Sequence, residues 1–148
     1  MIRSLIVAGA VLFLLGLLQG AIVQSFVNPR MALSAHLTAM QSGMAIMIVG
    51  AVWSEVSLSR ALAKAAPWTI IIGMYGLWLG VTLSAATGAS ETLTIAGASH
   101  RATPIAETAV STIVLGSSGL MTVGWLLFVL GLIRSKSTVP RGVTTERL

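Results

Sequence analysis

Apolar residues fill four long stretches of the chain, and polar residues gather between them. The stretches cover about residues 5–27, 34–54, 67–88 and 109–133. As an α-helix the first is about 34 Å long, which exceeds the ~30 Å hydrocarbon core of a bilayer. The pattern therefore predicts an all-α fold, an integral membrane four-helix bundle that occupies residues 1–134 as one domain. Pro29 and Pro67 are expected at or near helix starts, where a missing amide hydrogen is harmless.

Composition agrees with a membrane protein and narrows its chemistry. Of the 148 residues, 55% are hydrophobic and 9% are charged, and the mean hydropathy is +0.93. These values exclude an ordinary water-soluble globule. Because the chain has no Cys, disulfides, thiolate metal sites, iron–sulfur clusters and cysteine nucleophiles are excluded, and His, Met or oxygen ligands must hold any metal.

The basic residues predict the orientation of the chain in the membrane. They are scattered singly, without interleaved aromatic residues, so we expect no nucleic-acid partner despite the net charge of +5. The positive-inside rule favours N-in and C-in, in a bacterial inner (cytoplasmic) membrane, with 135–148 as a disordered cytoplasmic tail. The inner side then carries Arg3, Arg60, Lys64, Arg134, Lys136, Arg141 and Arg147, which leaves Arg30 and Arg101 outside.

Two pairs of glycines in the apolar stretches allow close approach of helices. Gly16 and Gly20 are four residues apart in the first stretch, as are Gly76 and Gly80 in the third. Small residues at this spacing occur where membrane helices pack closely. The sequence leaves open whether each pair serves a contact within the chain or one between subunits.

The second apolar stretch contains a histidine near its start. His36 is followed on the same helical face by Met40, Gly43, Met44 and Met47. An imidazole within a membrane span is costly and is by default a functional-site hypothesis. A small residue such as Gly43 lets a flat macrocycle approach, and haem iron accepts His or Met as ligand. Alternatively, His36 bonds a neighbouring helix and the methionines fill the core.

Ser42 and Tyr75 are the other polar candidates. Ser42 lies about 240° around the helix from His36, so in one subunit they serve different faces. In a cyclic oligomer, His36 of one subunit and Ser42 of the next can line one pocket. The Tyr75 phenol needs a partner, either a substrate oxygen or a facing carbonyl. His100, beside Arg101 in a loop, is either a second haem ligand or a solvated side chain.

The run from Asn28 to Leu37 resembles the membrane-bound hydroxylaminobenzene mutases. The resemblance continues through Gly43 and residues 50–53, and extends to residues 73–75 in the third stretch. More distantly, the chain resembles the styrene oxide isomerases. These are small four-helix membrane enzymes that assemble as trimers and hold haem b between subunits, with a histidine like His36 as axial ligand.

The resemblance implies a redox-neutral membrane isomerase whose ferric haem b acts as a Lewis acid on a substrate oxygen. The implied substrate is an arylhydroxylamine rearranged to an aminophenol, or a related aromatic or N–O compound. The expected partners are that small substrate, membrane lipid and further copies of the chain in a homotrimer. Under this hypothesis His36 binds the iron, Arg30 pairs with a haem propionate, Gly43 and Met40 border the macrocycle, and Ser42 and Tyr75 face the substrate.

The chain departs from the family pattern at two positions. The family carries Asn where this chain has Ser42 and Leu77, and those amides are thought to orient the substrate. Retention of His36 therefore supports haem better than it supports one substrate. The alternatives are an isomerase that converts aryl epoxides to aldehydes, a b-type electron-transfer subunit that uses His36 with His100 or a Met, and a non-catalytic membrane protein.

Overall fold

The structure is a computed structural model that describes residues 2–97 and 99–135. Four long helices dominate it: α1 (Ile2–Ala21), α2 (Pro29–Ala51), α3 (Arg60–Thr87) and α5 (Pro104–Ile133). Short helical turns η1 (Val23–Ser25), η2 (Trp53–Glu55) and α4 (Thr94–Gly97) lie between them. None of the described residues lies in a strand. The four long helices are long and apolar enough to cross a membrane, which confirms the predicted all-α fold and its four spans.

The helix bounds differ from the hydropathy limits because polar residues extend or end the helices. α1 ends at Ala21, and the chain turns through η1 where the sequence predicted continued helix to residue 27. α3 begins at Arg60, so Pro67 lies inside this helix, about two turns after its start. The prediction that Pro67 lies at or near a helix start is therefore wrong. The polar turns before Pro67 carry no apolar pattern, so hydropathy misses them. Pro29, by contrast, begins α2 as expected.

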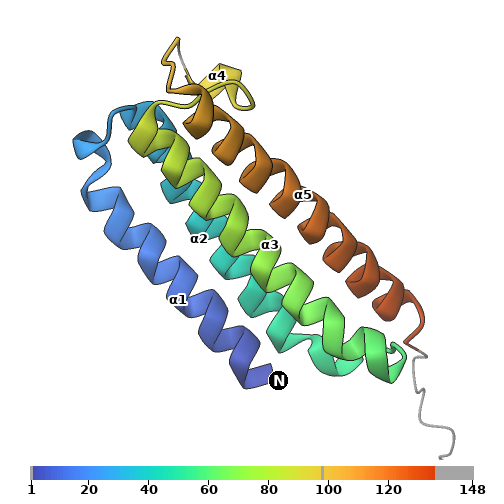
Figure 1. Ribbon diagram of the computed structural model, residues 1–148. Coiled ribbons are helices and arrows are strands. Elements are labelled where there is room, and N and C mark those ends of the chain that lie inside the picture. The colour runs from blue at the N-terminus through green and yellow to red at the C-terminus, as the bar shows by residue number, and fades with distance from the viewer. Residues whose placement is uncertain (1, 98, 136–148) are drawn as a thin grey trace, which may run out of the picture.

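The helices form an open row (Figure 1). α1 packs along α2, α2 contacts α3, and α3 packs along α5, while side chains of α3 also reach α1. α1 and α5 are the outer members, and the N-terminus lies at the same end of the row as the end of α5 (Figure 1). The outer helices expose large apolar side chains, including Val11, Leu14, Leu18, Leu115, Val123 and Leu126.

The two glycine pairs serve contacts within the chain. Gly16 and Gly20 lie against α2, and Gly76 and Gly80 lie against α5. A Cβ atom added to Gly80 would lie 2.8 Å from Cγ2 of Val114, closer than side chains pack. The absence of side chains at these positions therefore allows α1 to approach α2, and α3 to approach α5, at these turns.

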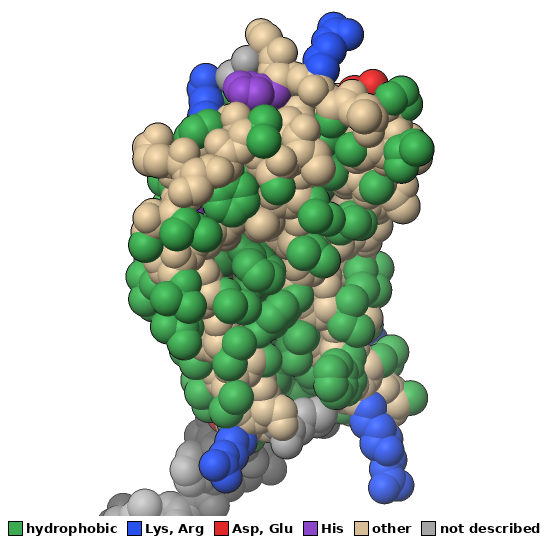
Figure 2. Space-filling view, turned by 60° about the vertical axis from the view of Figure 1, so that its left-hand side comes forward, with side chains coloured by type: hydrophobic (Ala, Val, Ile, Leu, Met, Phe, Trp, Pro, Cys, Tyr) green, Lys and Arg blue, Asp and Glu red, His purple; other side chains and the backbone are tan. Residues whose placement is uncertain are grey.

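Side-chain chemistry divides the surface into an apolar middle and charged ends. On the face in Figure 2, apolar side chains cover the flank, and Lys and Arg side chains project at both ends. This is the distribution expected of a chain that crosses a bilayer. Apart from Ser135, the predicted tail lies outside the described residues. Arg3, Arg60, Lys64 and Arg134 belong to the end with the N-terminus, and Arg30, Glu91 and Arg101 belong to the opposite end.

Asn28 fixes the start of α2. Its Oδ1 accepts a hydrogen bond from the amide of Met31 at 3.1 Å, as an N-cap residue does. Its Nδ2 donates to the carbonyl of Gly97 at 3.1 Å, and its backbone amide donates to the carbonyl of Ala85 at 3.0 Å. One buried residue thus joins α2, α3 and α4, through its side chain and its backbone amide, about two turns before His36.

Candidate functional site: the imidazole between α1 and α2

His36 is half-buried between α1 and α2, and a carbonyl of α1 selects the tautomer of its neutral ring. Its Nδ1 lies 2.7 Å from the backbone carbonyl oxygen of Gly16. A carbonyl oxygen only accepts hydrogen bonds, so Nδ1 carries the proton and donates. The neutral imidazole then has its lone pair on Nε2. The structure therefore presents Nε2 as the nitrogen that can bind a metal.

Gly20 provides the space in which the His36 ring lies. A Cβ atom added to Gly20 would lie 2.8 Å from Cε1 and from Nδ1 of His36, and 3.4 Å from Nε2. No side chain therefore fits at position 20 while the ring keeps this position. Gly16 and Gly20 are about one helical turn apart, so one turn of α1 supplies both the hydrogen-bond acceptor and the space.

The imidazole borders an apolar surface of α2. Leu33, Leu37 and Met44, which flank His36 on the helix, have exposed fractions of 50%, 47% and 43%. In a membrane-spanning helix this surface faces lipid or an apolar partner. A flat, hydrophobic group can therefore lie beside His36 without displacing a polar side chain.

The predicted role of Gly43 needs correction. A Cβ atom on Gly43 would lie 2.6 Å from the amide nitrogen of Phe13 and 2.7 Å from the carbonyl oxygen of Gly9. The gap that the sequence assigned to a macrocycle is thus filled by the backbone of α1. Met40 also faces α1, with its Cγ 3.1 Å from where a Cβ on Gly16 would lie. The prediction was wrong because a glycine indicates that another group approaches the helix closely, but the sequence does not say whether that group is a ligand or a neighbouring helix.

Tyr75 lies away from His36 in the same chain. Its hydroxyl donates to the carbonyl of Ala8 at 2.8 Å, so of the two alternatives the structure shows the facing carbonyl. Ala8 lies about 12 Å along α1 from Gly16. Tyr75 instead borders an apolar cavity of about 510 Å³ between α1 and α3, together with Ala8, Ile71, Ile72, Gly76, Trp78 and Leu79.

Ser42, Arg30 and Leu77 are likewise not gathered around the imidazole. Ser42 is buried in α2, on a different side of the helix from His36 and about 9 Å along its axis. Arg30 is exposed in the first turn of α2. Leu77 packs against the apolar clusters that contain Val81 and Val110. Leu77 is therefore partly buried against the core and lies apart from the imidazole.

A polar network that sequence reasoning missed joins α1 to α3. Trp78 Nε1 donates to Oε1 of Gln19 at 2.7 Å, and Nε2 of Gln19 donates to the hydroxyl of Thr82 at 3.1 Å. The Thr82 hydroxyl donates to the carbonyl of Trp78 at 2.8 Å. Gln19 lies between Gly16 and Gly20 in sequence, so the network anchors the turn that holds His36. The sequence pattern that could have indicated this network is the spacing of Trp78 and Thr82, which lie one helical turn apart on the same face of the third apolar stretch.

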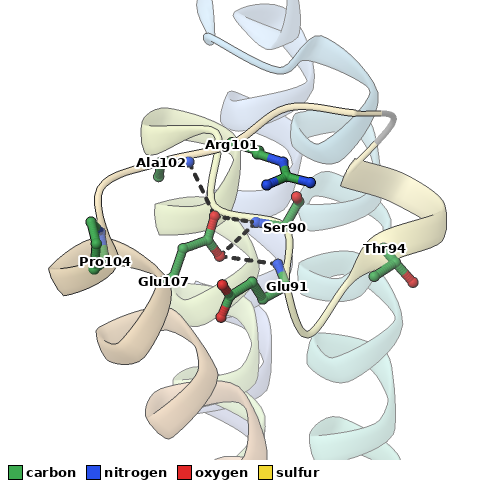
Figure 3. A pocket seen from close by; sticks show the side chains of 7 residues that line it. All are labelled: Ser90, Glu91, Thr94, Arg101, Ala102, Pro104 and Glu107. Atoms are coloured by element: carbon green, nitrogen blue, oxygen red, sulfur yellow. Dashed lines mark hydrogen bonds between the residues drawn. The ribbon is translucent and has the colours of Figure 1, made fainter.

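Glu107 organises the connection between α3 and α5 (Figure 3). Its carboxylate accepts backbone hydrogen bonds from Ser90 at 2.9 Å, Glu91 at 3.0 Å and Ala102 at 3.0 Å. These residues line a cavity of about 500 Å³ at the polar end of the molecule, together with Arg101 and others. Because both carboxylate oxygens are already bonded, Glu107 acts as a structural acceptor.

His100 lies in the same connection. Its Nδ1 is 2.9 Å from the carbonyl oxygen of Gly97, and its amide also donates to that carbonyl. Within residues 2–97 and 99–135, no three His, Cys, Asp or Glu side chains are grouped so that they can hold a metal ion. A metal bound by His36 therefore needs its other ligands from a macrocycle, another subunit or the substrate.

Fold and site together define a four-span membrane protein with a single oriented imidazole inside one span. Residues 1–133 match the family model of styrene oxide isomerase, and the chain belongs to this family. It is 37% identical over 131 residues to hydroxylaminobenzene mutase HabA of Ectopseudomonas oleovorans, which covers 88% of this chain and 97% of that protein. This confirms the predicted resemblance, and the chain is an isomerase enzyme of this family.

A second relative extends the comparison. Hydroxylaminobenzene mutase HabB of the same organism is 37% identical over 106 residues, which cover 71% of this chain and 65% of HabB. The chain thus spans slightly less than two thirds of HabB, whereas it spans nearly all of HabA. No solved structure matches the chain.

Proposed function

We propose that this enzyme is a haem b-dependent membrane mutase that rearranges an arylhydroxylamine, or a related N–O compound, to an aminophenol or its equivalent. The substrate class is supported by the similarity to a hydroxylaminobenzene mutase over almost its entire length. The cofactor is supported by one observation above all, the hydrogen bond from Nδ1 of His36 to the carbonyl of Gly16.

The donor set fits haem. A metal-bound histidine commonly donates its second ring nitrogen to a carbonyl or carboxylate, which fixes its tautomer and raises its basicity. The Nδ1 atom of His36 makes this bond to Gly16, so Nε2 is the nitrogen expected to hold the iron. The exposed apolar side chains beside it suit a hydrophobic macrocycle. When bound, ferric haem b supplies a Lewis acid that polarises the substrate N–OH oxygen.

Other residues of the chain position the reactants. Arg30, exposed at the membrane surface about 9 Å before His36 on α2, is suited to pair with a propionate. The surrounding apolar side chains exclude water and so strengthen electrostatic stabilisation of the reacting oxygen. Gly43, which contacts α1, has no part in this proposal.

Self-association completes the proposed site. Ser42 and Tyr75 lie too far from His36 to act with it in one chain. In the proposed homotrimer, haem lies at a subunit interface beside the exposed apolar side chains Leu33, Leu37 and Met44. Ser42 is buried in its own chain, so it would contribute to this site only if the helices around it separate on assembly. The Ser42 hydroxyl is shorter than the amide that relatives carry, so it leaves more room for the substrate. We therefore include other N–O compounds in the proposal.

Aryl epoxides are the second candidate substrates. The match to the styrene oxide isomerase model over residues 1–133 favours them specifically. Haem held by His36 would supply the same Lewis acid to an epoxide oxygen, and the epoxide would rearrange to an isomeric aldehyde. The same residues would therefore serve both reactions, and only a test with each class of substrate distinguishes the two functions.

The test is to purify the protein in mild detergent, record its absorption spectrum and titrate arylhydroxylamines and aryl epoxides. We expect a Soret band that shifts with the arylhydroxylamine, together with aminophenol product. His36→Ala should remove the band, because Nε2 of His36 is the nitrogen that the proposal assigns to the iron. His100→Ala is the matched control and should retain both band and activity.

Three results would contradict the proposal. Purified protein without haem, or His36→Ala protein that keeps its Soret band, would eliminate the assigned cofactor site. A six-coordinate low-spin spectrum that no substrate changes would instead favour an electron-transfer subunit. A shift with epoxides alone would move the assignment to epoxide isomerisation.

A further inference from the structure

We infer that α1 acts as a positioning element for His36, with Gly20 as the positioning residue and the Gly16 carbonyl as the group that selects the tautomer. The inference deepens the proposed function and rests on it where it concerns iron. The statement about the tautomer itself concerns only the protein.

The contacts of Gly20 distinguish it from other glycines of the α1–α2 interface. The three nearest atoms to a Cβ on Gly20 all belong to the His36 ring. At Gly9, by contrast, the nearest atoms include the backbone of Gly43 and Met47. Gly9 therefore allows two helices to approach, whereas Gly20 makes room for one imidazole.

The turn of α1 that holds the ring is itself fixed from the other side. Gln19, 5% exposed, is bonded to Trp78 and Thr82 of α3. Gln19 precedes Gly20 directly, so α3 restrains the backbone that contacts His36. Three helices thus determine where Nε2 points, although only α2 carries the histidine.

This arrangement has a chemical consequence for a bound iron. A hydrogen bond from Nδ1 to a carbonyl raises the basicity of Nε2 and makes it a stronger ligand. A stronger donor stabilises ferric over ferrous iron, and the ferric state is the better Lewis acid. Displacing the ring from Gly16 should therefore raise the reduction potential as well as weaken binding.

The first experiment measures the tautomer in full-length protein prepared without haem. The chain contains two histidines, so selective ¹⁵N-histidine labelling gives two sets of ring signals, and His100→Gln assigns them. We expect neutral His36 to be protonated at Nδ1. A ring protonated at Nε2 alone overturns the inference, whether or not the protein binds haem.

The second experiment compares Gly20→Ala with Gly50→Ala. Gly50 lies in the same interface, far from His36, and a Cβ there would meet Leu5 and Ile6 at 3.0 Å. We expect Gly20→Ala to lose the Nδ1–H signature, to bind haem about 10- to 100-fold more weakly, and to show a lowered iron–histidine stretching frequency and a raised potential. Gly50→Ala should leave all four unchanged.

The outcomes separate the two proposals. If the tautomer is as expected but wild-type protein binds no haem, the proposed cofactor fails and the positioning by α1 stands. If wild-type protein binds haem through His36 but Gly20→Ala changes neither tautomer nor affinity, the proposed function stands and the positioning role is wrong. If Gly20→Ala and Gly50→Ala change the tautomer and the haem affinity equally, helix packing alone is responsible. That result also overturns the positioning role of Gly20.

Discussion

His36 and Glu107 show how backbone groups decide what a buried polar side chain can do. Both are held by main-chain groups of a neighbouring segment. The Glu107 carboxylate accepts hydrogen bonds at both oxygens, so it has no open position toward its cavity. His36 uses one ring nitrogen for its bond to Gly16 and keeps the other available. The imidazole is therefore suited to bind a ligand, whereas the carboxylate stabilises a loop.

Asn28 makes two kinds of side-chain hydrogen bond, the N-cap bond to Met31 and the bonds to Ala96 and Gly97, and two substitutions remove them to different extents. Asn28→Ala should lower the free energy of unfolding in detergent by about 2 kcal/mol, since it loses the N-cap bond to Met31 and the bonds to Ala96 and Gly97. Asn28→Ser keeps a capping hydroxyl and should lose about 1 kcal/mol. Equal stability of both variants and wild type in a denaturation series would refute the assigned role.

At the scale of elements, two close helix pairs, α1 with α2 and α3 with α5, make up the row. Glycines lie in both contacts, and at Gly9, Gly43 and Gly73 the backbone of one helix meets the backbone of the other. The sequence showed these glycines and their spacing but left their partners open. Hydropathy likewise gave four spans but not the polar first turns of α3, so it misplaced Pro67 relative to the helix start.

Gly73 and Gly116 provide a matched pair for testing the contact of α3 with α5. A Cβ on Gly73 would lie 2.6 Å from the amide nitrogen of Met121, whereas one on Gly116 meets no atom within 4 Å. Gly73→Ala should therefore destabilise the protein by about 1–3 kcal/mol, since backbone cannot move aside cheaply. Gly116→Ala should be neutral or slightly stabilising.

Unfolding in detergent monitored by circular dichroism measures both changes. Comparable losses for the two variants would contradict the assigned packing. The oligomer mass of Gly116→Ala should also be recorded, because a partner that covers this face of α5 would make the substitution disruptive. A changed mass would identify that face as a subunit contact.

At the scale of the whole molecule, an open row leaves α1 and α5 as the outer helices and brings the N-terminus and the end of α5 to one end (Figure 1). Such a row cannot surround a ligand as a closed bundle does. His36, Ser42 and Tyr75 consequently face different surroundings. The single chain therefore does not bring these three side chains together, and the homotrimer that the family resemblance implies remains part of the proposal.

The orientation of the row is predicted from charge. Arg3, Arg60, Lys64 and Arg134 lie at the end that carries the N-terminus, so we expect that end in the cytoplasm of a bacterial cell. A reporter that is active only in the cytoplasm should function when fused at the C-terminus and fail when inserted in the connection near Glu91. The reverse pattern would refute the N-in, C-in orientation.

The sequence by itself determined the class of protein, the number of spans and the imidazole within the second one. It could do so because the cost of placing polar groups in hydrocarbon limits composition strongly along the chain. Tertiary structure decided that Gly43 contacts α1, that Tyr75 bonds the carbonyl of Ala8 and that Gly16 orients His36. These facts depend on which helix face meets which neighbour, and apolar helices in a membrane choose neighbours by close packing that hydropathy does not record.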